Sequence, residues 1–493
     1  MIILTFYEEK NVPFEIVYSK SGREFDKEIV YKKLCAIFGE SNVSKKEIDI
    51  FSYSKDYSPI STRWTLDGKL AAKPDFIAWA ENAEQISKLL ELANEVDVPV
   101  IPFGAGSGVV GGALPVYGGI ILDLKKMDKI IDINKINLTA TIQTGMNGMN
   151  LERELNKAGF TLGHIPQSIF TSTLGGYLAH KAAGQFSTKY GKIEDMVISL
   201  EAVLPTGEII KTKPSPRNSV GPQIDKLLLG SEGTLAIFTE ATLRIWTKPE
   251  KQELLSYAFD TLEESLNHVR EVLQNQAYPA VVRIYDKEET ERHFPDEKNA
   301  KNKFMTIFVC EGHPSVVTTE ESLIHEIASK YNGTDCGDKP VEHWFDTRFK
   351  VKETSTYTPI GFVVDTIEVS IMWDRAAKLY YDVIKEMKKV DGIVVATGHI
   401  SHFYEQGVCY YFSFGGTPGK LEDEEFSTKV WDACIKTTLK NKGSISHHHG
   451  IGINRTKWMK EEWGTSFDIL RKIKQSLDPK NVLNPGKLYG EDK

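Results

Sequence analysis

The chain of 493 residues lacks several features that mark whole classes of protein. No apolar run approaches the roughly 20 residues that a membrane-spanning helix needs. Residues 1–14 have no basic lead-in and no small-residue cleavage site, so we expect no secretory signal peptide. The sequence also contains no internal repeat and no low-complexity stretch. These absences predict a globular protein of the cytoplasm that has no transmembrane segment.

Cysteine and clustered positive charge are also scarce. The five cysteines are scattered and form no Cys-x-x-Cys pair, which argues against a zinc–thiolate motif and against a disulfide framework. The formal net charge is −8, and lysine and arginine form no block. Because nucleic-acid binding draws on clustered positive charge, we expect no nucleic-acid partner.

The order of predicted elements indicates an α+β protein with more than one core. We expect an N-terminal extension at 1–72 and a first domain at 73–250, where short strands alternate with amphipathic helices. Residues 251–443 are richer in helix and charge but keep intervening strands, which predicts a second α+β domain. Residues 444–493 return to glycine-rich loops and one helix, and we expect them to pack back on the first domain.

Three segments rich in glycine or hydroxyl groups lie in the first half. Residues 104–112 hold five glycines in nine positions, which permits a close backbone approach and positive φ. Their N–H groups would suit a pyrophosphate, although an inert surface loop fits about as well. The segment is not a P-loop, because no Gly-Lys-Ser/Thr follows. The other two segments are 163–176, with its Ser/Thr-Gly-Gly turn, and 229–237.

In this order and spacing, the three segments resemble the FAD domain of the FAD-linked oxidases, also called the vanillyl-alcohol oxidase or PCMH-type superfamily. The resemblance spans about 73–249. It implies a two-subdomain PCMH-type FAD-binding domain and an α+β substrate (cap) domain. FAD would be held non-covalently, because the first loop has no His or Cys to anchor it. The implied cofactor contacts are Pro102, Phe103, Gly104, Ala105, Gly106, Ser107, Gly108, Gln167, Ser168, Ile169, Phe170, Thr171, Ser172, Thr173, His180, Lys181, Ala182, Ala183, Glu232, Gly233, Thr234, Leu235, Ala236, Ile237 and Phe238.

Two branches of this superfamily are similar to the C-terminal half. One oxidises 2-hydroxy acids and typically carries Gly-His-x-Gly-Asp-Gly-Asn-x-His and Gly-Glu-His-Gly metal motifs. The other, alkyldihydroxyacetonephosphate synthase, exchanges an acyl chain for a fatty alcohol through a flavin N5 adduct. Residues 444–452 read Ser-Ile-Ser-His-His-His-Gly-Ile-Gly, which resembles the synthase. Extended backbone cannot turn three consecutive rings to one face, so we favour His448 and His449 as catalytic, with His447 contacting substrate.

The synthase resemblance implies further site residues. Tyr411 in the predicted strand 407–414 matches the catalytic tyrosine, with Tyr410 as the alternative if the register slips by one residue. Neighbouring groups would have to lower the pKa of this tyrosine for it to take a proton from carbon. Arg283 and Arg217 match substrate-binding arginines, and arginine suits phosphate because its fork binds two oxygens. His164 matches an active-site position.

One departure favours the hydroxy-acid branch. His399 and His402 lie in Gly-His-Ile-Ser-His, and with His448 they could gather around a metal. Since the rest of that motif is missing, we predict no metal.

Three functions stay open at this point. The favoured one is a synthase-like transferase that acts on a dihydroxyacetone phosphate-type substrate with a lipid-like chain. The alternative is an FAD-linked D-lactate or glycolate-type dehydrogenase, and the least favoured is a flavin-binding protein without turnover. In each case the partner is a small-molecule or lipid-like substrate. Peripheral membrane contact and a homodimer are both compatible with the sequence.

Overall fold

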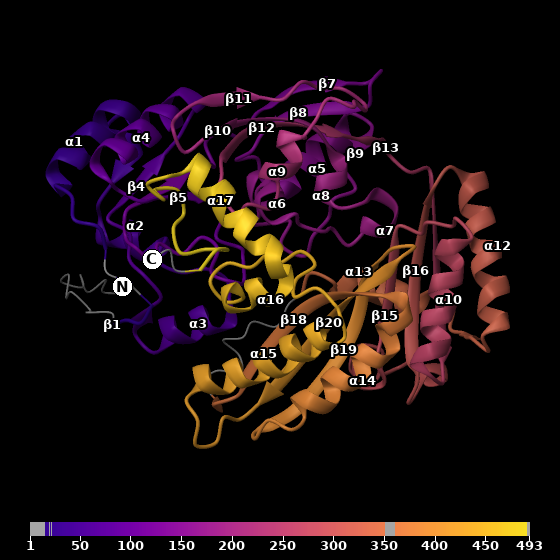
Figure 1. The fold of residues 1–493 in the computed structure, drawn as a ribbon. Coiled ribbons are helices and arrows are strands. Elements are labelled where there is room, and N and C mark those ends of the chain that lie inside the picture. The colour runs from indigo at the N-terminus through magenta and orange to yellow at the C-terminus, as the bar shows by residue number, and fades with distance from the viewer. Residues whose placement is uncertain (1–14, 19, 21, 351–359, 491–493) are drawn as a thin grey trace, which may run out of the picture.

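A computed structural model describes residues 15–18, 20, 22–350 and 360–490 of the chain. The expected N-terminal extension therefore lies partly outside the described residues. Two large bodies lie side by side, and the C-terminal segment crosses from one to the other (Figure 1). Across the described ranges, no helix combines the length and apolar character needed to cross a membrane.

The first body begins with short elements that pack on a four-stranded sheet. Helix α1 begins after Asp26, whose side chain accepts hydrogen bonds from the N–H groups of Glu28 and Ile29. The elements up to residue 70 are β1 (Glu15–Ile16), α1 (Lys27–Phe38), β2 (Val43–Ser44), α2 (Glu47–Ser52), α3 (Pro59–Leu66) and β3 (Lys69–Leu70), and β2 is itself a strand of this sheet. β1 and β3 pair with each other.

The four-stranded sheet has the order β2-β4-β6-β5. Its main strands β4 (Phe76–Trp79) and β5 (Val100–Phe103) both run parallel to β6 (Ile120–Asp123). Helix α4 (Ala83–Val96) connects β4 to β5 and buries its apolar face. The glycine-rich loop leaves the carboxyl end of β5, which is where ligands bind in open parallel sheets.

A five-stranded antiparallel sheet completes the first body, in the order β11-β10-β12-β8-β7. Its strands are β7 (Ile130–Asn134), β8 (Thr139–Gln143), β10 (Val197–Val203), β11 (Ile209–Lys211) and β12 (Ile237–Arg244). The elements around it are α5 (Gly148–Lys157), β9 (Phe160–Thr161), α6 (Leu174–His180), α7 (Ser187–Tyr190), α8 (Ile193–Met196), α9 (Ile224–Leu228) and β13 (Trp246–Thr247).

The second body is a seven-stranded antiparallel sheet in the order β17-β14-β16-β15-β19-β20-β18. Its strands are β14 (Lys251–Phe259), β15 (Val281–Tyr285), β16 (Phe304–Gly312), β17 (Thr334–Asp335), β18 (Val363–Met372), β19 (Ile393–Phe403) and β20 (Gly407–Gly416). Helices α10 (Leu262–Gln274) and α12 (Pro314–Lys330) pack on β14 and β16, whereas α14 (Ala376–Met387) packs on β19 and α15 (Asp423–Lys440) on β18 (Figure 1). The shorter helices are α11 (Lys287–His293) and α13 (Lys339–Thr347).

The C-terminal segment ties the two bodies together. Ser444 forms a β-bridge with Ser370 of β18, at the edge of the seven-stranded sheet. The chain then runs through α16 (Met459–Trp463) and α17 (Phe467–Leu477), which lie against the first body in yellow in Figure 1. Leu483 pairs with Val100 beside β5, and the Asn484 side chain donates to the carbonyls of Gly112 and Glu232. Residues after Ser444 therefore reach the glycine-rich loop.

Candidate active site

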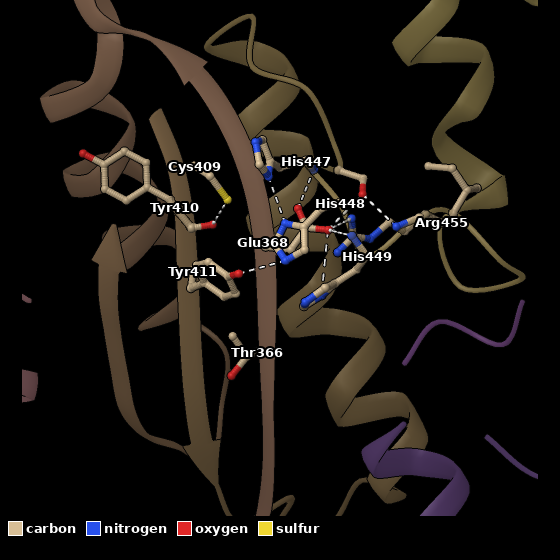
Figure 2. A network of polar contacts seen from close by, with 12 residues as sticks. Thr366, Glu368, Cys409, Tyr410, Tyr411, His447, His448, His449 and Arg455 are labelled. Carbon is tan, nitrogen blue, oxygen red and sulfur yellow. Dashed lines mark hydrogen bonds and ion pairs between the residues drawn. The ribbon is translucent and has the colours of Figure 1, made fainter. Parts of the chain in front are cut away.

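Strand register in the seven-stranded sheet decides which tyrosine faces the histidines. Tyr411 of β20 lies opposite Glu368 of β18 and opposite His399 of β19. Tyr410 is fully buried on the other face, where its hydroxyl donates to the Ala376 carbonyl at 2.9 Å. The structure therefore points Tyr411, and not Tyr410, toward the loop that carries the three histidines (Figure 2).

The Tyr411 hydroxyl lies between two imidazoles. It is 2.8 Å from Nε2 of His448 and 3.0 Å from Nε2 of His402, whose Nδ1 is 2.7 Å from the Ser187 hydroxyl. These contacts form a continuous chain, Ser187–His402–Tyr411–His448, which could carry a proton. Ser187 belongs to α7, so the first body supplies one end of the chain and the sheet supplies the middle.

The charge states of this chain follow from its burial. Burial lowers the pKa of His402 and of His448 well below the ordinary value, so both rings are neutral at pH 7. Burial also raises the pKa of Tyr411 well above its ordinary value. This differs from the expectation that neighbouring groups lower it. The reason is that burial is the largest effect and Cys409, Glu368 and Tyr404 add to it, whereas Arg283 opposes it.

All three adjacent histidines gather at the site, contrary to the expectation that only two could. The chain bends at 447–449 instead of running extended, so consecutive side chains need not alternate. The Nδ1 atoms of His447 and His448 are 2.9 Å apart, and Nε2 of His447 is 2.8 Å from the Tyr404 hydroxyl. The His449 ring centroid lies 4.5 Å from that of His448 and 5.9 Å from that of Tyr411.

A buried carboxylate on β18 holds this loop from the side of the sheet. Glu368 accepts the backbone N–H groups of His447 and His449 at 2.5 and 2.8 Å, and the Ser446 hydroxyl at 2.8 Å. It also pairs with Arg455 at 2.9 Å, and both side chains are fully buried. Burial alone would raise the pKa of Glu368, but Arg455, His449 and the two N–H groups outweigh burial and hold it below its ordinary value.

A second carboxylate holds the same loop from the first body. Glu232 accepts the N–H groups of Ile451 and Gly452 at 2.6 and 2.8 Å. Its backbone has a φ of +50°, a conformation that most side chains avoid. A Cβ at Gly450 would lie 2.6 Å from a Glu232 carboxylate oxygen, so this close approach requires glycine. The histidine loop is thus fixed between two buried acids, one from each body.

Two arginines lie around the Trp344 ring, and the charge of one of them, Arg283, acts on Tyr411 and His402. Arg283 on β15 donates to the Tyr285 hydroxyl at 2.8 Å, and its guanidinium lies 5.9 Å from the Trp344 ring centroid. Arg348, which follows α13, lies 5.2 Å from the same ring and donates to Gln185 at 3.1 Å. Among the described residues, no carboxylate lies within ion-pair distance of either guanidinium. Both are therefore free to bind an anionic group of a ligand.

The remaining predicted residues take different positions. His164 is buried, which lowers its pKa to about 3, and neither ring nitrogen finds a partner within the described chain. The His399 ring stacks on Tyr411 at 4.7 Å, and its Nδ1 is 3.0 Å from Glu289. Arg217 is not brought to the cluster. It is exposed in the proline-rich loop 213–223, where no strand or helix directs it toward the histidines.

In the metal trio considered from the sequence, the His402 and His448 rings lie 4.9 Å apart between their centroids. His402 uses both ring nitrogens for Ser187 and Tyr411, and His399 uses Nδ1 for Glu289. A different group does converge in the described part of the chain. The potential ligand atoms of Cys409, His447 and His448 all lie within 4.8 Å of one another.

The three cofactor segments pack against one another around buried polar atoms that lack protein partners. A Cβ on Gly104 would lie 2.3 Å from the Thr173 hydroxyl, and one on Gly233 would lie 2.9 Å from Pro102. Nε2 of His180 and the Ser231 hydroxyl are buried without a hydrogen-bond partner in the described structure. Such atoms fit a ligand with its own donors and acceptors, such as FAD. Most of the predicted cofactor residues are buried or partly buried, whereas Gln167, Phe170 and Thr171 are exposed.

Sequence reasoning missed Glu368 and Arg348. Glu368 is a charged residue between Ile367 and Val369, and that contrast was the available signal. Arg348 follows Trp344 and Phe345 at the end of a helix, a pattern that carries no comparable signal.

Family models cover most of the chain. The FAD binding domain model matches residues 74–213, and the model of the C-terminal domain of FAD linked oxidases matches residues 248–488. The alkyldihydroxyacetonephosphate synthase of Dictyostelium discoideum is 30% identical over 85% of this chain and 74% of its own length. An uncharacterized FAD-linked oxidoreductase, YgcU of Escherichia coli (strain K12), is 32% identical over 93% of this chain and 96% of its own.

Solved structures and hydroxy-acid enzymes also match. An alkyldihydroxyacetonephosphate synthase structure superposes with a TM-score of 0.79 at 26% identity, covering 95% of this chain and 87% of that one. Glycolate oxidase subunit GlcD of Bacillus subtilis (strain 168) is 25% identical over 94% of this chain and 97% of its own. These relatives confirm the α+β PCMH-type fold and the FAD cofactor. The chain belongs to the FAD-linked oxidase family and is an FAD-dependent enzyme.

Proposed function

We propose that this enzyme is a transferase similar to alkyldihydroxyacetonephosphate synthase, which replaces the acyl chain of an acylated ketone phosphate with a fatty alcohol. The observation that carries the proposal is the Tyr411 phenol held between the neutral rings of His402 and His448. A protonated phenol beside a neutral imidazole forms a donor–acceptor pair for proton transfer, and both groups are uncharged before the proton moves.

In this proposal the two arginines bind the substrate phosphate. The guanidinium groups of Arg283 and Arg348 both lie near the Trp344 ring, and neither has a carboxylate partner in the described chain. A dianionic phosphate would satisfy both guanidinium groups, and arginine forms short, charge-assisted bonds to phosphate oxygens. The lipid-like chain would then extend away from the arginines.

The proton chemistry falls to Tyr411 and His448. The phenolic oxygen takes a proton from the substrate carbon while Nε2 of His448, 2.8 Å away, takes the phenolic proton. In the exchange the ester C–O bond breaks, a fatty acid leaves, and the alcohol oxygen forms the new C–O bond while its proton balances the leaving carboxylate. The proton held by His448 then returns through Tyr411 to the substrate carbon, which restores the neutral ring.

FAD, when bound, supplies the electron-accepting ring that this exchange requires without net oxidation. The residues placed to hold it are the three glycine- and hydroxyl-rich segments, with Ser231 and His180 offering unused polar atoms. Neither ring nitrogen of the buried His164 has a hydrogen-bond partner in the described chain, which supports a role for His164 in contacting the ligand.

A 2-hydroxy-acid dehydrogenase is the second candidate. The two arginines could bind a carboxylate as well as a phosphate, and hydroxy-acid enzymes are among the relatives. The neutral rings of His402 and His448 could then accept the hydroxyl proton of the substrate.

Anaerobic flavin absorbance separates the two functions. The purified yellow enzyme is mixed with D-lactate or glycolate, and separately with an acylated dihydroxyacetone phosphate. The transferase predicts bleaching with the acylated ketone phosphate alone, reversed by a fatty alcohol without oxygen. Bleaching by a hydroxy acid, reversed by an electron acceptor, would replace the transferase with the dehydrogenase.

A further inference from the structure

Two neighbouring histidines in the loop each keep one ring nitrogen free of the rest of the protein. His447 uses Nε2 for the Tyr404 hydroxyl, and His448 uses Nε2 for the Tyr411 hydroxyl, each at 2.8 Å. Their Nδ1 atoms therefore point at each other, 2.9 Å apart. The buried thiol of Cys409 on β20 adjoins this pair, so that three potential ligand atoms lie within 4.8 Å of one another (Figure 2).

We propose that Cys409, His447 and His448 form a zinc site. Zinc prefers tetrahedral nitrogen and sulfur ligands. With Zn–N bonds of about 2.0 Å, two ligand nitrogens at the tetrahedral angle lie roughly 3.3 Å apart. The two Nδ1 atoms would need to part by only a few tenths of an ångström. Thiolate and imidazole ligands also select zinc over magnesium or calcium, which prefer oxygen.

The surroundings of the two rings suit metal ligands. A histidine that binds a metal generally donates its other N–H to a neighbouring group, which fixes the tautomer and the ring orientation. The hydroxyls of Tyr404 and Tyr411 hold that position here. Three protein ligands leave a fourth position for water or substrate, as in zinc sites that exchange a ligand.

Binding would change what His448 can do. Zinc displaces the thiol proton of Cys409 and moves the proton shared between the two Nδ1 atoms onto an Nε2 atom, so both rings stay neutral and the net release is one proton. His448 then donates to the Tyr411 oxygen and cannot accept the phenolic proton. If the proposed transfer through Tyr411 is correct, bound zinc therefore inhibits turnover.

Cobalt binding tests the site without any substrate. Chelator-treated holoenzyme is titrated with Co²⁺, whose tetrahedral complexes absorb in the red, beyond the flavin bands. We expect one equivalent to bind, Zn²⁺ to displace it, and Cys409→Ser to weaken binding at least tenfold. The matched control is Cys434→Ser, which removes another buried thiol, in α15, and should bind cobalt as the unaltered enzyme does.

Several outcomes would overturn the site. One is the absence of a tetrahedral cobalt spectrum. Another is an equal affinity for cobalt in Cys409→Ser and the unaltered enzyme. The third is that both serine variants weaken cobalt binding equally. If Cys409→Ser does not bind FAD, zinc-edge X-ray absorption of the unaltered enzyme decides instead, since a sulfur neighbour at about 2.3 Å is required. Activity is a separate readout. Zinc that binds through Cys409 but leaves or raises turnover would keep the site and overturn its inhibitory role.

Discussion

Replacing Glu368 with glutamine should loosen the histidine loop while leaving the shape of the side chain almost unchanged. Glu368 accepts hydrogen bonds from Ser446, His447, His449 and Arg455. Glutamine has one acceptor oxygen in place of two and carries no charge. One donor of the loop would therefore face an amide N–H₂ group, and the fully buried Arg455 would lose its counter-charge.

The size of the effect follows from these two losses. Removing one partner of a buried ion pair typically costs about 3–5 kcal/mol, because the other charge stays buried and uncompensated. A buried N–H without an acceptor costs about 1–3 kcal/mol. Part of this free-energy cost is recovered as the loop relaxes or admits water. We therefore expect local opening of the loop to become easier by at least about 3 kcal/mol, which is a factor of roughly a hundred in the opening equilibrium.

Hydrogen exchange of the amides at 444–455, measured by mass spectrometry on the holoenzyme, reports this opening directly. The Glu368→Gln enzyme should exchange about a hundredfold faster there, with a lower kcat and an almost unchanged KM, because the arginines that bind the anion are untouched. Glu320→Gln is a matched control. Glu320 is a buried carboxylate of α12 that accepts the Tyr278 N–H and lies apart from the loop.

A double-mutant cycle separates the lost charge pair from a general loss of packing. Arg455→Met alone leaves the Glu368 charge buried, whereas Glu368→Gln with Arg455→Met leaves neither charge. The double variant should exchange more slowly than the sum of the single effects predicts. Additive effects, or unchanged exchange and kcat in Glu368→Gln, would show that this carboxylate does not hold the loop.

Three further predictions concern the reacting groups. Tyr411→Phe should lower kcat by at least a hundredfold with FAD still bound, and normal turnover would remove the phenol from the chemistry. Arg348→Lys should raise KM for the anionic substrate at least tenfold, since lysine loses the planar fork, whereas an unchanged KM would exclude it from the anion site. Burial lowers the pKa of His402 and His448 well below 6.5, so the unfolded chain binds more protons. Stability should therefore fall as pH drops below about 6.5, by up to about 1.4 kcal/mol per pH unit for each ring, and equal urea midpoints at pH 7.5 and 5.5 would contradict their neutral state.

Local patterns were enough to predict much of the fold. The 3.6-residue spacing of Ile86, Leu89 and Leu90 predicted helix α4, and all three side chains are fully buried. The strand predicted at 407–414 is part of β20 (Gly407–Gly416). Local patterns could not predict the order of the seven strands, because that order depends on pairings between residues far apart in the chain. The opposition of Glu368 and Tyr411 across two strands is one such pairing.

The same distinction applies to the site. A resemblance of short motifs identified the three histidines and Tyr411, and the period of two along a strand then separates Tyr411 from Tyr410. Motif resemblance matched Arg217 to a substrate-binding position, whereas the structure leaves this side chain exposed in a loop with three prolines and no strand pairing. It also gave no reason to notice Glu368, since a buried charge is explained only by its partners, and Arg455 is 87 positions away.

The two carboxylates together imply that the histidines are positioned only when both bodies are docked. Glu368 on the sheet holds the N–H groups of His447 and His449, whereas Glu232 in the third cofactor segment holds those of Ile451 and Gly452. A change in the cofactor segment should therefore reach the histidine loop through Glu232. We expect Glu232→Gln to speed hydrogen exchange at 447–452 even in molecules that retain FAD. Faster exchange confined to 102–112 would mean that Glu232 supports only the cofactor loop, and that Glu368 alone positions the histidines.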